Sequence, residues 1–444
     1  MSRWIGLDLH KRVLEVCIVN DVGAVESRHR VTVTREQLKA FAQDHLHSED
    51  RVAVEATTNT WPVVELLRPF VAEIVVSNPM RTAAIAEAKV KTDKVDAATL
   101  AQLLRAQFLP GVWQPDAATA QLRQLTGRRS ALVGDATAIK NRIHAILHQR
   151  LIPNPSCKLF CQQGKEWLQK VLLELEPDDR VAIERDLHLL EELEAGIAEI
   201  EQRIFCIGGA DHRLKLLITL PGVDVLCAQT LLAALGDVSR FPDGDHAASY
   251  LGLVPSTKQS AAHIYHGPIT KAGRGHARWM LVEAAQHVAN HPGPLGVFFR
   301  RLASKKGRNV AVVATARKLV VLAFELLRRD EPYRYALPRP TSQKLSRLRM
   351  RSGGPRRVTG CSKGTRASAK LSTGEPCRTV KPLMTVYADE NLPSLPPPPD
   401  GERRLQRRAQ LAAFVASLAE PQVRPIRRRA ATSVAPTSAE TVDA

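Results

Sequence analysis

Short apolar runs alternate with amphipathic segments from residue 3 to about residue 110. The runs are rich in β-branched side chains and predict strands at 3–9, 13–20, 25–33, 51–57 and 73–77. Thr34 can cap a helix over 35–46, and a second helix is expected from Thr60, with Pro62 in its first turn. A further helical pattern follows strand 73–77 and includes Asp93 and Asp96.

The order of three meandering strands followed by alternating helices and strands is that of an RNase H-like α/β sheet. The acids on the strands would then gather at the sheet edge where the last helix packs.

Residues 113–210 show helical periodicity in two apolar stripes. The first contains Leu122, Leu125, Leu132, Ile139, Ile143, Ile146 and Leu147, and the second Leu187, Leu190, Leu193, Ile197, Ile200 and Ile204. Pro153, Pro155 and Pro177 interrupt the pattern between the stripes. Two long amphipathic helices predict an antiparallel hairpin or a coiled coil used for dimerisation, and an ordinary helical linker fits the same pattern.

Residues 211–335 are predicted to form a mainly helical domain. The segment Leu220-Pro221-Gly222-Val223-Asp224, followed by an Ala- and Leu-rich helix, resembles a helix-hairpin-helix unit. The turn at Gly222 could present backbone N–H groups to a phosphate, as a helix N-terminus does, or Gly222 could simply be a turn glycine.

The remaining residues, 336–444, contain a run of four prolines at 396–399 and three arginines at 427–429. Abundant Ser, Thr and Gly accompany them, so this segment is predicted to be a disordered basic tail with one short helix at 402–419. The pattern thus divides the chain into domains at 1–112, 113–210, 211–335 and 336–444.

The charge of the chain points to a polyanionic partner. Its 444 residues include 63 Lys and Arg against 45 Asp and Glu, a formal net charge of +18. From Ala336 onward there are 20 basic and 8 acidic residues, so +12 lies in the tail and +6 in the first 335 residues. A surplus of this size is typical of nucleic-acid binding, and the body of the protein should bind through local basic patches.

Cysteine usage and hydropathy indicate the compartment. The seven scattered cysteines fit reduced thiols in a cytoplasm. No apolar stretch reaches the roughly 18 residues of a membrane span, and no signal peptide is expected at the start. We therefore expect a cytoplasmic protein with no membrane partner.

Four carboxylates indicate a metal site. Asp8 and Glu55 lie in apolar runs predicted as strands, where a carboxylate is costly unless it is paired or holds a metal. Asp93 and Asp96 are three residues apart in a helical pattern, so they share one face. Two acids on strands and two on one helical face suit a pair of Mg²⁺ ions about 4 Å apart, the arrangement used for phosphoryl transfer.

These acids also carry a family resemblance. The first domain resembles the DEDD transposases of bacterial insertion sequences, the IS110 family, and the related Piv-type DNA invertases, in Gly6-Leu7-Asp8-Leu9-His10-Lys11, Val54-Glu55-Ala56-Thr57 and Lys91-Thr92-Asp93-Lys94-Val95-Asp96-Ala97. The third domain is similar to the C-terminal domain of that family in Leu220-Pro221-Gly222-Val223, Tyr250-Leu251-Gly252-Leu253-Val254-Pro255, Gln259-Ser260 and Ile269-Thr270-Lys271-Ala272-Gly273 with Arg278. The resemblance covers residues 3 to about 335 in order.

The resemblance implies a bacterial DNA recombinase, associated with the nucleoid, whose RNase H-like (RuvC-like) domain binds Mg²⁺. It further implies that the C-terminal domain supplies a serine nucleophile, Ser260, and that an element-encoded bridge RNA guides the enzyme to donor and target DNA. Homo-oligomers, dimers or tetramers with composite active sites, are also implied. In this family a glycine follows the serine, whereas Ala261 follows it here, which leaves Ser256 as the alternative nucleophile.

Several residues around this serine are expected to contact nucleic acid. Lys258, Lys271, Arg274 and Arg278 lie in or beside glycine-rich backbone and could bind phosphates, although solvated surface charges would look the same.

Two other functions remain open. The metals could activate water, as in a RuvC-like endonuclease or junction resolvase, or the chain could be a non-catalytic nucleic-acid scaffold. Formation of a protein–DNA adduct separates the serine mechanism from hydrolysis, and cleavage in Mg²⁺ separates both from a scaffold.

Overall fold

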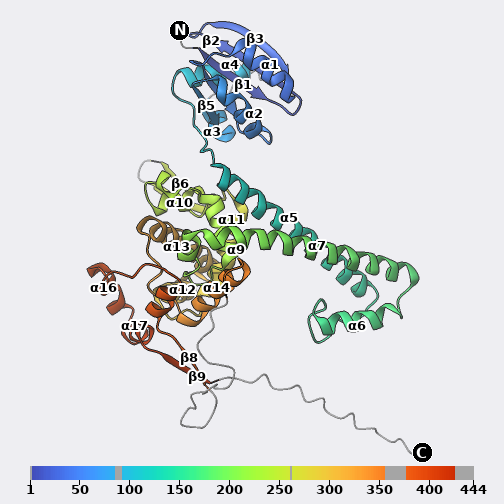
Figure 1. The fold of residues 1–444 in the computed structure, drawn as a ribbon, viewed down its shortest axis with the longest axis vertical. Helices are drawn as coiled ribbons and strands as arrows, with labels where there is room; N and C mark the ends of the chain where they lie inside the picture. Colours follow the sequence, from blue (N-terminus) through green and yellow to red (C-terminus); the bar gives the residue numbers. More distant parts are fainter. Residues whose placement is uncertain (1–2, 86–92, 261–262, 356–376, 426–444) are drawn as a thin grey trace, which may run out of the picture. The chain divides into compact units, whose positions relative to one another are not determined.

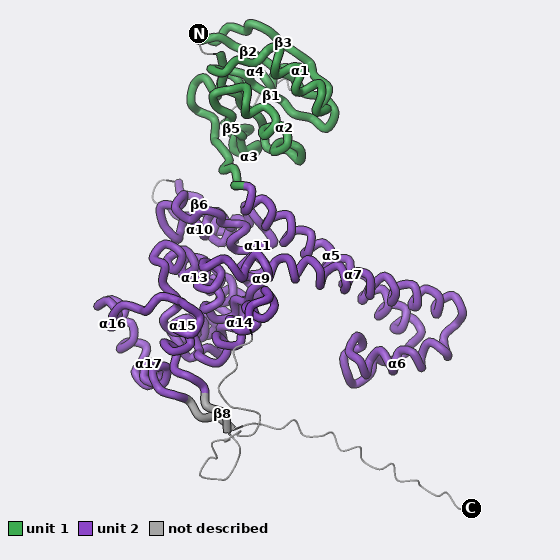
Figure 2. Tube along the Cα trace, viewed as in Figure 1, with its two compact units in different colours: residues 1–116 green, residues 117–444 purple. Residues whose placement is uncertain are grey.

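The computed structural model describes residues 3–85, 93–260, 263–355 and 377–425 (Figure 1). The chain divides into two compact units, residues 1–116 and residues 117–444 (Figure 2). Within the described residues, no helix combines the length and the apolar character needed to cross a membrane.

The first unit is a mixed five-stranded sheet with helices, so the predicted α/β architecture is confirmed. Its elements are β1 (Trp4–Leu9), β2 (Val13–Val19), β3 (Val25–Thr32), α1 (Arg35–His45), β4 (Arg51–Glu55), α2 (Thr60–Leu67), the 3₁₀ turn η1 (Arg68–Phe70), β5 (Glu73–Ser77), α3 (Pro79–Ile85) and α4 (Asp93–Arg105). The strand order is β3-β2-β1-β4-β5. Strands β1, β2 and β3 are antiparallel neighbours, whereas β4 runs parallel to β1 and β5 parallel to β4.

Alternation along the strands gives the sheet two apolar faces. One face, with Ile5, Leu7 and Val52, packs against α1 and α2. The other face is lined by small or partly buried side chains and is covered by α4, which contributes Ala97 and Ala101. Because Asp8 alternates with Leu7 and Leu9, its side chain lies on the α4 face.

Gly6 allows α4 to approach the sheet closely. A Cβ atom built on Gly6 would lie 1.9 Å from the carbonyl oxygen of Ala97 and 2.7 Å from the nitrogen of Ala101. No other residue type could occupy this position without displacing the helix backbone. Polar contacts fix the helix further, since Arg28 donates to the carbonyl of Lys94 and Gln102 to that of Gly23.

The second unit begins with an antiparallel helical hairpin. Helices α5 (Ala117–Gln149) and α7 (Pro177–Ala210) pack along their predicted stripes, with α6 (Gln162–Leu172) against their outer end. Arg142 pairs with Asp186 and Lys140 with Glu194 along the hairpin. These contacts lie within one chain, and a role of the hairpin in dimerisation stays a prediction.

A larger helical core follows the hairpin. It contains α8 (His212–Leu217), α9 (Val225–Leu235), the 3₁₀ turn η2 (Val238–Arg240), α10 (Gly244–Tyr250), α11 (Gly275–Val288), α12 (Pro294–Lys306), α13 (Arg308–Arg329), α14 (Pro338–Arg351), α15 (Leu383–Asp389), α16 (Asp400–Arg408) and α17 (Ala412–Ala419). Two small antiparallel ribbons accompany them, β6 (Pro255–Ser260) with β7 (His263–Ile269) and β8 (Cys377–Val380) with β9 (Gln422–Pro425). Helix α13 packs against α10, α11 and α12 and lies at the centre of this core.

The prediction of a disordered tail from residue 336 is wrong for a large part of it. Helix α14 buries Leu345 and Leu348 in the core, and α15 buries Leu383 and Tyr387. The single helix predicted at 402–419 is instead two helices, α16 and α17, separated at 409–411. Composition alone suggested disorder because these apolar side chains are sparse among Arg, Pro and Ser. Residues 356–376 and 426–444 of the predicted tail lie outside the described residues.

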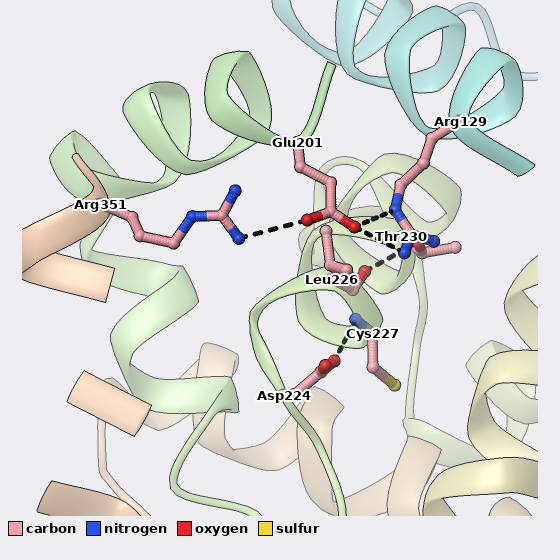
Figure 3. Close-up of polar contacts among 7 residues, drawn as sticks. All are labelled: Arg129, Glu201, Asp224, Leu226, Cys227, Thr230 and Arg351. Atoms are coloured by element: carbon pink, nitrogen blue, oxygen red, sulfur yellow. Dashed lines mark hydrogen bonds and ion pairs between the residues drawn. The ribbon is translucent and has the colours of Figure 1, made fainter. Parts of the chain in front are cut away.

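An ion-pair network attaches α14 to the hairpin. The carboxylate of Glu201 on α7 accepts a hydrogen bond of 2.7 Å from Arg129 on α5 and one of 3.2 Å from Arg351 on α14 (Figure 3). Burial opposes ionisation of Glu201, but hydrogen bonds and charge from the two guanidinium groups hold its pKa below the usual value. Helix α14 is therefore an integral part of the second unit.

Substitution of Gly6 tests the close approach of α4. We expect Gly6→Ala to displace α4 and to increase amide hydrogen exchange in residues 97–104 strongly, because the added Cβ overlaps backbone atoms. Gly111→Ala is the matched control in the same unit, since its Cβ would meet only Val75 at 3.7 Å. Unchanged exchange in Gly6→Ala would contradict the packing described here.

His291 should make the stability of the second unit depend on pH. Its buried ring accepts a hydrogen bond from Gly293 N–H at 3.0 Å, and burial together with Lys344 and Arg300 lowers the pKa of His291 to about 4. The folded state therefore holds the neutral ring, while the unfolded chain takes up a proton below about pH 6.5. We expect the free energy of unfolding to fall by about 3 kcal/mol as the pH decreases from 6.5 to 4.

Chemical denaturation across this pH range measures the effect. His291→Asn keeps an acceptor for Gly293 N–H and removes the titrating group, so its stability should vary less with pH than that of the wild type. Equal pH dependence in both proteins would show that His291 is not the source.

Candidate active site

Two of the predicted acids lie on neighbouring strand ends of the first unit. Strands β1 and β4 are parallel, and Leu7 is in register with Val54. The next residues along these strands are Asp8 and Glu55, which therefore lie side by side on the α4 face of the sheet. The side chain of Asp8 is buried and Glu55 is half-buried.

Helix α4 brings the other two acids to the same edge. Asp93 is its first residue and Asp96 lies one turn later. The next residues of the helix include Ala97 and Leu100, which are buried against the sheet. Burial is the largest effect and raises the pKa of Asp8, His10 opposes it, and the negative charges of Asp93 and Asp96 raise this pKa by smaller amounts. The structure thus gathers three predicted acids closely enough to repel one another, with Glu55 on the adjoining strand.

His10 lies between two of these carboxylates. Its Nε2 atom is 3.1 Å from Oδ2 of Asp8 and 3.4 Å from Oδ1 of Asp93. The negative charge of Asp8 is the main cause that raises the pKa of His10. The backbone of this loop is held by Asn59, whose side-chain amide donates to the carbonyl of His10 at 3.3 Å.

This cluster can hold a divalent cation. One ligand atom from each of Asp8, His10 and Asp93 lies within 4.8 Å of the others, the one group of this kind within the described residues. Carboxylate oxygens are the donors that Mg²⁺ and Mn²⁺ prefer, and imidazole is compatible with other transition metals. Asp8 is buried while His10 and Asp93 are exposed, so a cation can reach the cluster. Neighbouring negative charges favour its binding, and the donor set therefore fits a metal ion.

Two polar residues of this edge had no predicted role. His10 was not predicted as a site residue, although the Asp-x-His spacing could have suggested that it lies beside Asp8. Glu15 is directly opposite Asp8 in the β1–β2 register, is buried, and lies with Oε1 3.2 Å from Nε of Arg30. Glu15 lies inside the apolar run of β2, so the pattern that singled out Asp8 could also have singled out Glu15.

Ser260 lies in the second unit, at the end of the β6–β7 hairpin. It is exposed and directly opposite His263, and the turn residues Ala261 and Ala262 lie outside the described residues. The alternative nucleophile, Ser256, is half-buried, and its hydroxyl is so close that a Cβ on Gly267 would lie 2.5 Å from it. Of the two serines, Ser260 is the more accessible.

The predicted nucleic-acid contacts differ in their surroundings. Lys258, Lys271 and Arg274 are exposed around the hairpin, and Lys271 has a positive φ of 54°. Arg278 is already used within the fold, because its guanidinium donates to the carbonyls of Leu251 and Ala272.

Gly222 forms the turn between α8 and α9 with φ of 78°. A Cβ there would lie 2.1 Å from the carbonyl oxygen of Ala284 on α11. The glycine is thus required for helix packing, and contact of this turn with DNA stays a prediction.

Comparison with known families agrees with both parts of the chain. A DEDD-type IS110 transposase model matches residues 5–152, and a model described as "Transposase IS116/IS110/IS902 family" matches residues 214–297. The first match contains all four acids and the second contains Ser260.

Similar proteins include transposases and DNA-inverting proteins. The pilin gene-inverting protein of Moraxella bovis is 26% identical over 347 residues, which cover 74% of this chain and 97% of the relative. A probable family 20 transposase of Pseudomonas aeruginosa is 28% identical over 348 residues, which cover 74% of this chain and 98% of the relative. The transposase for insertion sequence element IS1111A of Coxiella burnetii is 25% identical over 249 residues, which cover 55% of this chain and 68% of the relative. With both domain matches in order along one chain, this protein belongs to the IS110/IS116 family of transposases.

Proposed function

We propose that this transposase cuts and rejoins DNA by phosphoryl transfer, with Mg²⁺ held by Asp8, Glu55, Asp93 and Asp96 and with Ser260 as the nucleophile. The observation that carries the proposal is the convergence of Asp8, His10 and Asp93 at one edge of the sheet, where one ligand atom from each lies within 4.8 Å of the others. Carboxylates brought together in a partly desolvated place are costly unless a cation compensates them. The strand order is also that of an RNase H-like sheet, which we propose as the fold of this unit.

The protein residues have separate tasks in this proposal. Asp8 and Glu55 are fixed by the sheet, and Asp93 and Asp96 by α4, so the ligand positions are set before DNA binds. Bound there, divalent ions would neutralise charge that develops on the phosphate. His10 holds the carboxylates of Asp8 and Asp93 in place, and Asn59 orients the His10 loop.

Ser260 would form the covalent link to DNA. Its Oγ forms a bond to phosphorus while the bond from phosphorus to a deoxyribose oxygen breaks; the serine proton is transferred to a base, and the leaving oxygen takes up a proton from a general acid. We propose His263, which is directly opposite Ser260 in the strand register, as the base. Rejoining reverses the step, with a deoxyribose hydroxyl of the new partner strand displacing Ser260.

Other partners follow from the family resemblance. We propose that an element-encoded bridge RNA selects donor and target DNA and that the enzyme acts as a homo-oligomer. The positive charge of the chain is compatible with binding both nucleic acids. DNA inversion, the activity named for the Moraxella relative, needs the same strand exchange and differs only in the arrangement of the two sites.

Hydrolysis by a RuvC-like endonuclease is the alternative enzymatic function, and a nucleic-acid scaffold is the non-catalytic one. The family resemblance at Gln259-Ser260 favours the covalent route over hydrolysis. The four intact acids favour an enzyme over a scaffold.

Removal of Asp8 tests the metal site. Asp8→Ala should lower cleavage of a plasmid that carries the element by roughly 10³-fold, since several kcal/mol of transition-state stabilisation are lost. Folding should be retained because the change removes a buried charge from a repulsive cluster. Asp44→Ala, at an exposed position on α1, is the matched control and should cleave normally. Cleavage by Asp8→Ala at the wild-type rate would refute the metal site.

A comparison of the two serines tests the nucleophile. Ser260→Ala should abolish the covalent protein–DNA adduct on a denaturing gel, because no Oγ remains to attack phosphorus. Ser256→Ala should retain the adduct, since its half-buried hydroxyl lies at the base of the hairpin. An adduct formed by Ser260→Ala would exclude this serine, and cleavage without any adduct in the wild type would favour hydrolysis.

A further inference from the structure

We propose that Arg123, Arg240 and Arg274, gathered around the hydroxyl of Tyr250, form a binding site for a phosphodiester group of nucleic acid. The proposal rests on the nucleic-acid function proposed above and adds a specific site to it. The three arginines come from α5, from η2 and from the residue that precedes α11, so only the folded chain brings them together.

Two of the guanidinium groups are positioned by the end of α9. Arg123 donates from Nε to the carbonyl of Ala233 at 2.7 Å and from its terminal nitrogen to that of Ala234 at 3.2 Å. Arg240 donates from Nε to the carbonyl of Leu235 at 3.0 Å. The C-terminus of a helix carries about half a negative charge, so these two arginines more than compensate it.

Aromatic rings fix the orientation of Arg240. Its guanidinium carbon lies 4.0 Å from the ring centre of Phe241 and 4.3 Å from that of Tyr250. A planar guanidinium held against two rings has a fixed orientation. One terminal nitrogen of Arg240 is buried, so this residue acts on a bound anion mainly through its charge.

The electrostatics of the cluster favour an added negative charge. Burial and repulsion from Arg274 and Arg240 lower the pKa of Arg123 to about 10, with Tyr250 acting in the opposite direction. Burial opposes ionisation of Tyr250, yet Arg240, Arg123 and Arg274 bring its pKa below the usual value. Asp237 offsets part of the charge on Arg240. A phosphodiester would relieve the repulsion that remains among three guanidinium groups.

The cluster lies at the base of the hairpin that carries Ser260. Tyr250 precedes β6 and Arg274 follows β7, and the two segments touch, because a Cβ on Gly273 would lie 2.1 Å from the carbonyl oxygen of Tyr250. The six residues of β6 span about 20 Å. The arginine cluster and Ser260 therefore lie at opposite ends of one hairpin.

Binding measured in EDTA tests the site independently of cleavage. The probes are a fluorescein-labelled duplex DNA and a labelled RNA hairpin, each titrated with the full-length protein at several salt concentrations. Arg274→Gln should weaken binding of at least one probe by about tenfold at low salt and should reduce the slope of log affinity against log salt by about one. The probe that responds identifies the nucleic acid that the site holds.

The matched control and a double-mutant cycle complete the test. Arg128→Gln removes an equal charge from an exposed position on α5, five residues from Arg123, and should have a much smaller effect. If Arg123 and Arg274 hold one phosphate, the double variant should lose less affinity than the two single losses combined. Arg274 is exposed, so its variant folds even if Arg123→Gln does not.

An effect of Arg274→Gln no larger than that of Arg128→Gln on both probes would overturn the proposal. The same binding loss is expected in an Asp8→Ala background, because the site does not depend on the metal-binding acids. Failure of the cleavage chemistry and failure of this site are therefore distinguishable.

Discussion

The close contact between α4 and β1 determines the chemistry of the first unit. Because Gly6 has no side chain, the carbonyl of Ala97 can lie where a Cβ atom would otherwise be. This contact places the first turn of α4, with Asp93 and Asp96, beside the end of β1, where Asp8 is the penultimate residue. A helix held farther from the sheet by even one methyl group would separate the carboxylates.

Basic side chains of the protein lie beside this concentration of carboxylates, and the negative charge of Asp8 raises the pKa of His10. The imidazole of His10 lies within 3.4 Å of both Asp8 and Asp93, and Arg30 lies beside the buried Glu15 on the next strand. Because His10 and Arg30 reduce the repulsion among the carboxylates, the fold can form and the acids can still bind a cation. Ligand positions fixed in advance by strand and helix backbones are what a site for phosphoryl transfer requires.

The second unit depends on α14, a helix in the segment that was predicted from its composition to be disordered. The ammonium group of Lys344 on α14 donates to the carbonyls of Leu220 and Val223, both at 2.9 Å, so it fixes the glycine turn between α8 and α9. Burial lowers the pKa of Lys344 to about 8, despite the opposing charge of Asp224. Arg123 and Arg240 similarly satisfy carbonyls at the end of α9. Basic side chains thus complete backbone hydrogen bonding in this unit. The half-buried Arg123 and Arg240 also bring positive charge to the cluster around Tyr250.

Local patterns predicted the strands of the first unit and the two long helices, because alternation and helical periodicity are properties of neighbouring residues. They also singled out Asp8 and Glu55, since a carboxylate inside an apolar run is recognisable without a structure, and they indicated that the last helix packs beside these acids. Packing between distant segments was needed to show that His10 and Glu15 join this edge and that Arg123 lies near Tyr250. It also decided that α14 and α15 are folded, because the burial of Leu345 and Tyr387 comes from packing against residues far away in sequence. The composition of a segment cannot predict contacts of this kind.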